Sequence, residues 1–274
     1  MNKLMKTIAT LLLVCSALVV PTAQAGRSCE AKKATPQMIG RGLTLAEKTL
    51  VSLNASGEKA VLLARAGQDL SKYGLRYLHM GLAWEQPDGQ GGMTWRGLHK
   101  LNECGTSTSA IYKQGLGEFF LDDPWRFEAA WLAPSADVQA HLLALLQDPN
   151  RSIALHSRPY RIVSCAWGTR YQQSNQWMTE TLAASMEPQI RSREQAQAWL
   201  QFKGYEPGVL RLGPLTRLGG RLTAANVAFD DHPDEKRFSD RIETVTVDSV
   251  FNWVQRAQLV QPGAAGKSLT VVKL

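Results

Sequence analysis

The sequence has few of the features that mark several large classes of protein. Its 274 residues include only four cysteines, and their spacings match no zinc motif, so we expect neither a metal site nor a cofactor. Beyond the N-terminal segment, no apolar run approaches the roughly 18 residues of a membrane-spanning helix, so we expect no transmembrane anchor. Long runs of like charge and internal repeats are also missing. We therefore expect no nucleic-acid partner.

The first 25 residues have the composition of a secretory signal peptide. Lys3 and Lys6 give a positive start, residues 8–20 are almost entirely apolar, and Ala23-Gln24-Ala25 is a small-x-small cleavage site. We therefore expect a periplasmic or secreted protein that is cleaved near Ala25. Cleavage lowers the net charge from +7 to +5, because the segment carries two lysines and no acidic residue. This mild excess indicates an ordinary solvated surface.

Three cysteines remain in the predicted mature chain. In an oxidising compartment two of them are able to pair, and a bridge between Cys29 and Cys104 would tie the new N-terminus to a loop. Cys165 lies in the apolar string 162–167 and is predicted to be a buried small apolar residue. Without a helix N-terminus to lower its pKa, we expect its thiol to be inert.

Hydrophobic periodicity and turn residues predict an α+β fold. Strands are predicted at residues 59–65, 75–85, 94–101, 126–133 and 160–166. Helices are predicted at residues 35–54 (with Leu43, Leu45, Ala46, Leu50 and Leu53 inward), 135–149, 175–186, 192–202 and 248–257, with short helical pieces over 109–120. The turn at 87–92 joins two of the strands in an antiparallel hairpin.

The chain length suits one domain. We predict a single α+β domain over residues 26–262, in which a small antiparallel sheet packs against a helix that starts near Ser174. Its core spans about residues 35–203, residues 204–262 form a C-terminal wrap on that core, and residues 263–274 form a flexible tail.

Two of the five histidines lie on the predicted hairpin, one on each strand. Because His79 and His99 are about equally far from the turn, we expect their rings to lie close together on one face of the sheet. A purely structural role is the alternative for either ring. The pair is a candidate for acid–base chemistry only if a third group meets it.

Ser174 is the candidate third group. It lies in the uncharged polar run 172–175, directly before a predicted helix. Serine is a good N-cap, since its oxygen accepts a hydrogen bond from a backbone N–H two or three residues later. The same position also suits a nucleophile, because backbone N–H groups converge at a helix start. The sequence leaves both interpretations open.

The order of these residues resembles the permuted papain-like fold. The match consists of His79-Met80-Gly81 on a strand, His99 on the next strand, and Ser174-Asn175-Gln176-Trp177 at a helix start. This circularly permuted branch of the NlpC-type peptidases includes the lecithin retinol acyltransferase-like enzymes. The resemblance implies His79 as a general base, His99 or Asn102 as the group that orients its ring, and Ser174 in the place of the nucleophile. The branch has an Asn-Cys pair where this chain has Gln173-Ser174.

A closer resemblance covers most of the predicted mature chain. Residues 69–77, 101–105 and 174–177 are similar to stretches of a family of secreted bacterial proteins of unknown function. This resemblance implies export but no particular activity.

Two functions follow from the papain-like resemblance. In an amidase, esterase or acyltransferase acting on cell-wall peptide or acyl lipid, His79 would take the proton of Ser174, and the backbone N–H of Asn175 would stabilise the oxyanion. In a binder, the same groove would hold an envelope peptide, lipid or protein without chemistry. A helix dipole that ionises a thiol does not ionise a hydroxyl, so we favour the binder. The candidate binding residues are Asn102, Asn175, Trp84, Trp95 and Trp177.

Overall fold

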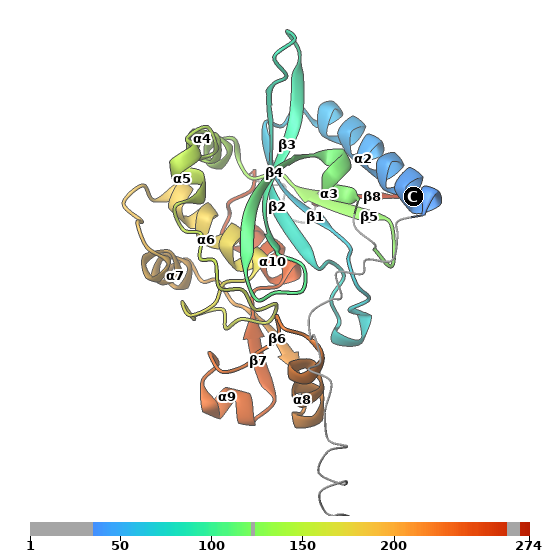
Figure 1. The fold of residues 1–274 in the computed structure, drawn as a ribbon. Helices are drawn as coiled ribbons and strands as arrows, with labels where there is room; N and C mark the ends of the chain where they lie inside the picture. Colours follow the sequence, from blue (N-terminus) through green and yellow to red (C-terminus); the bar gives the residue numbers. More distant parts are fainter. Residues whose placement is uncertain (1–34, 122–123, 262–268) are drawn as a thin grey trace, which may run out of the picture.

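The strands form one six-stranded antiparallel sheet in the order β4-β3-β2-β1-β5-β8 (Figure 1). The computed structural model describes residues 35–121, 124–261 and 269–274. The sheet strands are β1 (Ala60–Arg65), β2 (His79–Pro87), β3 (Met93–Asn102), β4 (Ser109–Gly115), β5 (Glu128–Leu132) and β8 (Leu269–Lys273). Together with the helices, this sheet confirms the α+β class.

Helices cover both faces of the sheet (Figure 1). One side carries α2 (Pro36–Ser56) and α3 (Leu116–Phe120). The other carries α4 (Ala136–Leu146), α5 (Pro149–Ile153), α6 (Ser174–Met186), α7 (Arg193–Phe202) and α10 (Val247–Arg256). The central strands β1 and β5 are therefore buried on both sides.

Each face of the sheet has its own apolar core, because successive strand residues point to opposite sides. Leu62 of β1 belongs to the cluster that contains Leu182 of α6. The next residue, Leu63, belongs to the cluster that contains Leu53 of α2 and Phe119 of α3. We term these sides the α6 face and the α2 face.

Three helices begin where the sequence predicts them, each at a capping residue. The hydroxyl of Thr35 accepts a hydrogen bond from the backbone N–H of Met38 at 3.2 Å, and Pro36 occupies the first turn of α2. Ser135 and Ser192 cap α4 and α7 in the same way. The inward stripe of α2 is partly mispredicted. Leu45, Ala46 and Leu53 are buried, but Leu43 and Leu50 are exposed.

The predicted hairpin is confirmed, with β2 and β3 paired in antiparallel register. Asp88 closes its turn. One carboxylate oxygen accepts hydrogen bonds from the backbone N–H groups of Gln90 at 2.7 Å and Gly92 at 3.0 Å. Gly89 has φ of 80°, a left-handed conformation that favours glycine. The turn sequence thus fixes the hairpin locally.

Two segments differ from their predicted secondary structure. Residues 109–115 form β4 and not short helical pieces, and helix is confined to α3. Residues 160–166, predicted as a strand, form turns. The carbonyl oxygens of Cys165 and Ala166 accept hydrogen bonds from the side chain of Gln176, at 3.1 Å and 3.2 Å. Hydrogen bonds from α6 thus take the place of pairing with a neighbouring strand at the end of this segment.

The predicted flexible tail is wrong for residues 269–273. They form β8 at the edge of the sheet and pair antiparallel with β5. Val271 packs against the core of the α6 face and Val272 against the core of the α2 face. The ammonium of Lys273 lies 3.7 Å from a carboxylate oxygen of Glu128. The C-terminus therefore completes the sheet.

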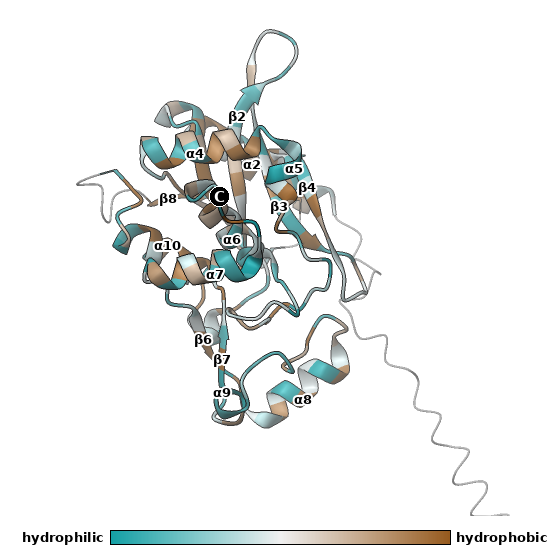
Figure 2. Ribbon diagram, turned by 90° about the vertical axis from the view of Figure 1, so that its left-hand side faces the viewer, coloured by the Kyte–Doolittle hydropathy of each residue, from teal (hydrophilic) through white to brown (hydrophobic). Residues whose placement is uncertain are grey.

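Residues 208–244 form a small lobe beyond one end of the sheet. It contains β6 (Gly208–Arg211), α8 (Pro214–Thr223), α9 (Asp234–Phe238) and β7 (Arg241–Thr244), with β6 and β7 paired antiparallel. Its own apolar cluster contains Leu210, Leu212, Phe229 and Ile242. Both views place this lobe and the tip of the β2–β3 hairpin at opposite ends of the molecule (Figure 1 and Figure 2). The chain then returns through α10 to the main core.

Several sequence predictions concern residues outside the described ranges. These are the signal peptide at 1–25, Cys29, and residues 263–268 of the predicted flexible tail. Cys104 is disulfide-bonded and Cys165 is a buried free cysteine, so the pairing of Cys104 with Cys29 stays a prediction. Among the described residues, no helix combines the length and apolar character needed to cross a bilayer.

Removal of residues 269–274 tests the role of β8. We expect truncation to lower the free energy of unfolding by about 3 kcal/mol, because several ladder hydrogen bonds and the packing of two valines are lost. Urea denaturation of the two proteins measures the difference. Deletion of Leu274 alone is the control, and equal midpoints for the truncated and full chains would show that the strand contributes nothing.

Candidate functional site

The polar run before α6 is buried. α6 contacts β2 and β3 of the sheet on one side and α4 and α7 on others, and its residues from Ser174 to Ser185 are all buried. Buried amide groups destabilise a fold unless they are hydrogen-bonded. The partners of these side chains therefore decide whether the run is a reactive site or part of the framework.

Gln173, and not Ser174, caps α6. Its side-chain oxygen accepts a hydrogen bond from the backbone N–H of Asn175 at 3.1 Å, and Ser174 is already the first helical residue. The amide nitrogen of Gln173 donates to the hydroxyl of Thr244 at 3.1 Å. The interpretation of Ser174 as the N-cap is therefore wrong, and the true cap joins α6 to the end of β7.

Asn175 joins the same helix start to the sheet. Its side-chain oxygen accepts a hydrogen bond from the backbone N–H of Met80 at 3.1 Å. Its amide nitrogen donates to the carbonyl oxygens of Leu78 at 3.2 Å and Val245 at 3.3 Å. Three hydrogen bonds thus tie this side chain to the framework.

Gln172 uses all four of its hydrogen-bonding positions. Its oxygen accepts from Nζ of Lys100 at 2.7 Å and from the backbone N–H of Ser157 at 2.9 Å. Its nitrogen donates to the carbonyl oxygen of Leu155 at 2.9 Å and to the carboxylate of Glu180 at 2.6 Å. An amide side chain can make no more than these four bonds. Gln172 therefore has a structural role.

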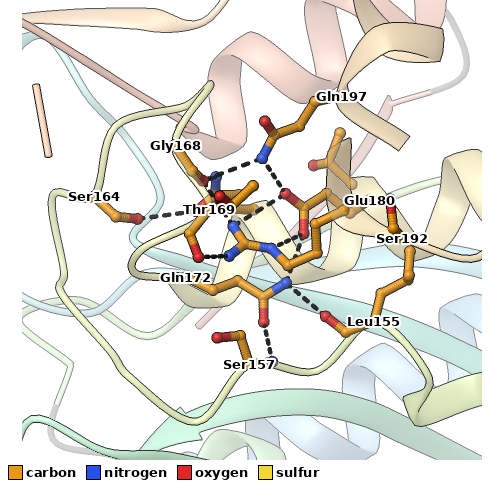
Figure 3. Close-up of polar contacts among 12 residues, drawn as sticks. Leu155, Ser157, Ser164, Gly168, Thr169, Gln172, Glu180, Ser192 and Gln197 are labelled. Atoms are coloured by element: carbon orange, nitrogen blue, oxygen red, sulfur yellow. Dashed lines mark hydrogen bonds and ion pairs between the residues drawn. The ribbon is translucent and has the colours of Figure 1, made fainter. Parts of the chain in front are cut away.

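A buried carboxylate lies at the centre of this network (Figure 3). Nε of Arg193 donates to one oxygen of Glu180 at 2.8 Å, and a terminal nitrogen donates to the other at 3.2 Å. Gln197 adds a further bond at 2.8 Å. The Glu180 side chain is 1% exposed and that of Arg193 is 8% exposed, so the pair is screened from water. We term Gln172, Glu180, Arg193 and Gln197 the Glu180 hub.

Lys100 of β3 extends the Glu180 hub to the sheet. Its side chain is fully buried, and Nζ donates to Gln172 and to the carbonyl oxygen of Ser157, both at 2.7 Å. Burial, together with the charge of Arg193, lowers the pKa of Lys100 to about 6. A lysine of lowered pKa is a common nucleophile. Here both hydrogens of the neutral amine are taken up by framework acceptors.

Among the described residues, Ser174 has no base beside it. Its side chain is buried, and its hydroxyl has one described neighbour, the hydroxyl of Tyr160 at 3.5 Å. Burial raises the pKa of Tyr160, so this phenol stays protonated and cannot take a proton from serine. The helix N-terminus alone does not ionise a hydroxyl.

His79 and His99 lie close together, as the hairpin predicts. Nε2 of His79 is 2.8 Å from Nδ1 of His99, and Nε2 of His99 is 2.7 Å from the side-chain oxygen of Gln114. Because that oxygen only accepts, Nε2–H of His99 donates to Gln114. Nδ1 of the neutral His99 ring then accepts a hydrogen bond from Nε2–H of His79. Burial lowers the pKa of His79 well below its ordinary value, and the charge of Arg65 adds to the effect. The ring of His79 is therefore neutral.

His79 and Ser174 lie on opposite faces of the sheet. The ring of His79 packs on Phe119, which belongs to the core of the α2 face, with ring centroids 5.8 Å apart. Met80, the next residue, belongs to the core of the α6 face. Because strand side chains alternate, the imidazole of His79 points away from α6. The predicted transfer of a proton from Ser174 to His79 is therefore contradicted.

The other predicted binding residues do not converge either. Asn102 closes its own loop by donating to the carbonyl oxygens of Thr106 and Thr108, and it does not orient His79. Trp84 lies in the core of the α6 face and Trp95 in that of the α2 face. Trp177 is fully buried. The prediction of one groove lined by all three tryptophans is therefore wrong.

Two open hollows lie beside the hairpin, one on each face. The larger, of about 400 Å³, is lined by Trp84, Glu85, Gln86, Pro87, Met93, Lys113, Leu146, Gln147 and Pro149. The smaller, of about 240 Å³, is lined by Ala46, Glu47, Leu50, Thr94, Trp95, Arg96, Gly115, Leu116 and Gly117. Sequence reasoning found Trp84 but missed its neighbours, because they come from β2, β3, β4 and the end of α4. The described part of the chain holds no group of three or more His, Cys, Asp or Glu side chains suited to a metal ion.

Comparison with known proteins gives one match. A family model described as "Uncharacterized protein conserved in bacteria (DUF2145)" matches residues 52–254. The match covers strands β1 to β7 and the whole Glu180 hub. No curated protein and no solved structure matches the chain.

Glu180→Gln tests whether the hub is a framework element. We expect the free energy of unfolding to fall by about 3 to 5 kcal/mol, because the substitution leaves the charge of Arg193 buried without a counter-charge. Urea denaturation measures the loss. Glu180→Gln/Arg193→Met removes both charges and is expected to recover part of it, whereas Glu206→Gln on the surface should change little. A surface-like effect of Glu180→Gln would refute this role.

Ser174 is expected to be unreactive. A serine-directed phosphonylating probe should leave it unmodified, because no base is within reach. In a Cys165→Ala background, the thiol of Ser174→Cys should react with iodoacetamide more slowly than free cysteine, because it is buried. Intact-protein mass spectrometry follows both reactions. Modification of Ser174 that disappears in His79→Ala would restore the catalytic interpretation.

Proposed function

The chain belongs to the DUF2145 family of bacterial proteins, and we propose that it is an exported, non-catalytic binding protein of the periplasm. It holds an envelope peptide in the larger hollow, between the β2–β3 hairpin and the end of α4. The signal-peptide pattern of the first 25 residues supports export.

The direction of the His79 ring supports a function without chemistry. In outline, a helix whose start packs on an antiparallel sheet agrees with the permuted papain-like resemblance. In such a site, however, base and nucleophile must lie within about 3 Å of each other. Here the sheet separates His79 from Ser174, and Gln172, Gln173 and Asn175 are engaged in packing. This geometry supports a role as framework, because the described residues pair no base with Ser174.

The chemistry of the larger hollow suits a peptide better than an acyl chain. Leu146 and Met93 give it an apolar side, while Nζ of Lys113 lies 5.0 Å from the ring centre of Trp84. Glu85 adds an acidic group, and its carboxylate is paired with Lys59. The volume of the larger hollow lies within the roughly 300–1,000 Å³ of ligand pockets. Charges of both signs beside apolar surface match the side chains and termini of a peptide.

An exposed strand edge adjoins this hollow. β4 pairs with β3 on one side, and over residues 110–114 the described chain gives it no strand on the other. Lys113 lies on this strand and also lines the hollow. An extended peptide can add to such an edge through main-chain hydrogen bonds while its side chains enter an adjacent pocket. A peptide is therefore the ligand class that uses both features.

Binding of soluble stem peptides released from peptidoglycan tests the proposal. Isothermal titration calorimetry with this mixture should detect binding by the mature protein. Met93→Ser and Lys113→Glu are expected to weaken it about five- to tenfold each, the effect of about 1 kcal/mol per lost contact. Both side chains are exposed, so neither change should disturb folding.

Matched changes elsewhere provide the control. Leu50→Ser lies at the smaller hollow and Lys72→Glu lies away from both hollows, and neither should alter binding. Absence of binding by the wild-type protein would refute the peptide ligand. Equal losses for Met93→Ser and Leu50→Ser would move the site away from the larger hollow.

A further inference from the structure

Helix α8 is turned with its apolar side outward. Its leucines, Leu215, Leu218 and Leu222, are 85%, 53% and 60% exposed. The spacing of three and four residues places them on one side of the helix. The one residue that α8 buries is Arg217. A ten-residue amphipathic helix normally buries its leucines and exposes its arginines, so this arrangement is the reverse of the usual one.

The contacts of Arg217 explain why the helix keeps this orientation. Its guanidinium donates to the carbonyl oxygen of Leu212 and to the carboxylate of Asp240. On the same inner side, Gly220 lies close to Val227, since a Cβ at that glycine would come within 3.1 Å of the valine. The small apolar cluster of the lobe contains none of the α8 leucines. The lobe thus fixes α8 through a charged pair and leaves its apolar side uncovered by the described chain.

Positive charge lies in the same segment of the chain as this apolar side. Residues 207–229 contain three arginines and no aspartate or glutamate. Arg217 is neutralised by Asp240. Arg211 and Arg221 are both exposed, and among the described residues neither takes part in an ion pair. The segment therefore offers leucines together with two solvated positive charges.

We propose that α8 docks this protein on the surface of an anionic phospholipid bilayer. In this arrangement Leu215, Leu218 and Leu222 lie at the boundary of headgroups and acyl chains, and the solvated charges of Arg221 and, from β6, Arg211 meet anionic headgroups. The two exposed arginines, Arg211 and Arg221, are complementary to such a surface and favour it over a neutral one. This docking is separate from the peptide hollow and does not rest on it.

The place of α8 at one end of the molecule suits this contact. It lies at the outer end of the lobe, away from the sheet, in both views (Figure 1 and Figure 2). Figure 2 shows apolar and polar residues interleaved along this short helix. The β2–β3 hairpin and its hollow lie at the other end of the molecule. A protein bound through α8 would hold its peptide hollow away from the lipid.

Vesicle flotation with the mature protein tests the docking. We expect binding to vesicles of equal parts phosphatidylglycerol and phosphatidylcholine, and much weaker binding to phosphatidylcholine alone. Leu215→Ser/Leu218→Ser/Leu222→Ser should lower the partition coefficient at least about tenfold. Arg211→Gln/Arg221→Gln should lower it about fivefold per charge on the anionic vesicles only, and high salt should have a similar effect.

Phe202→Ser is the control for nonspecific adsorption to vesicles through an exposed apolar side chain. This side chain is 81% exposed at the end of α7, outside the lobe, and its loss should leave vesicle binding unchanged. Equal binding to both kinds of vesicle, or retained binding by the leucine variant, would overturn the proposal. A wild-type dimer that the leucine variant converts to a monomer, detected by light scattering, would instead assign the leucines to a second copy of the chain and also overturn it. Far-ultraviolet circular dichroism confirms that each variant is folded.

Discussion

The fold depends on the buried carboxylate of Glu180. A charge removed from water destabilises a protein strongly unless it is paired and hydrogen-bonded, so this carboxylate has to be surrounded by donors before α6 can enter the core. Arg193 brings α7 to it, and Gln172 brings the segment that precedes α6. Through Gln172 the same network reaches Lys100 in the sheet. One ionic contact thereby sets the relative positions of two helices, an irregular segment and β3.

This constraint explains why a polar run at a helix start resembles a reactive site and is not one. Glutamine and asparagine side chains each offer both donors and acceptors, which suits a catalytic loop and equally suits a junction between backbone segments that form no regular pairing. The turns at residues 155–168 have carbonyl groups without strand partners, and Gln172 and Gln176 bind several of them. Sequence gives the composition of such a run, but only its partners distinguish the two roles.

The features predicted correctly from sequence are those with local causes. Thr35, Ser135 and Ser192 cap helices through contacts within three residues, and Asp88 closes its hairpin within four. The features that failed have distant causes. β8 becomes a strand because β5 offers it an edge. Residues 160–166 form turns, and Gln176 binds the carbonyl groups of Cys165 and Ala166 at their end. Glu180 itself reads as an ordinary helical glutamate until α7, thirteen residues later, folds against it. The local sequence contains no pattern that predicts contacts between such distant segments.

The two histidines show which part of a site's geometry can be predicted from local sequence and which part cannot. The symmetry of the hairpin was sufficient to place His79 beside His99, since register follows from the turn. Which face they occupy depends on the side on which α6 packs, and the alternation of strand residues makes that choice absolute. With Met80 facing α6, His79 must face α3; a shift of one residue would exchange them. A motif whose spacing matches a known site therefore specifies which residues are neighbours within the sheet. Catalysis also requires that the base and the nucleophile lie on the same face of the sheet. In this protein the Glu180 hub fixes α6 on the side away from the imidazoles, so the interaction that stabilises the fold is also the one that separates the candidate base from the candidate nucleophile.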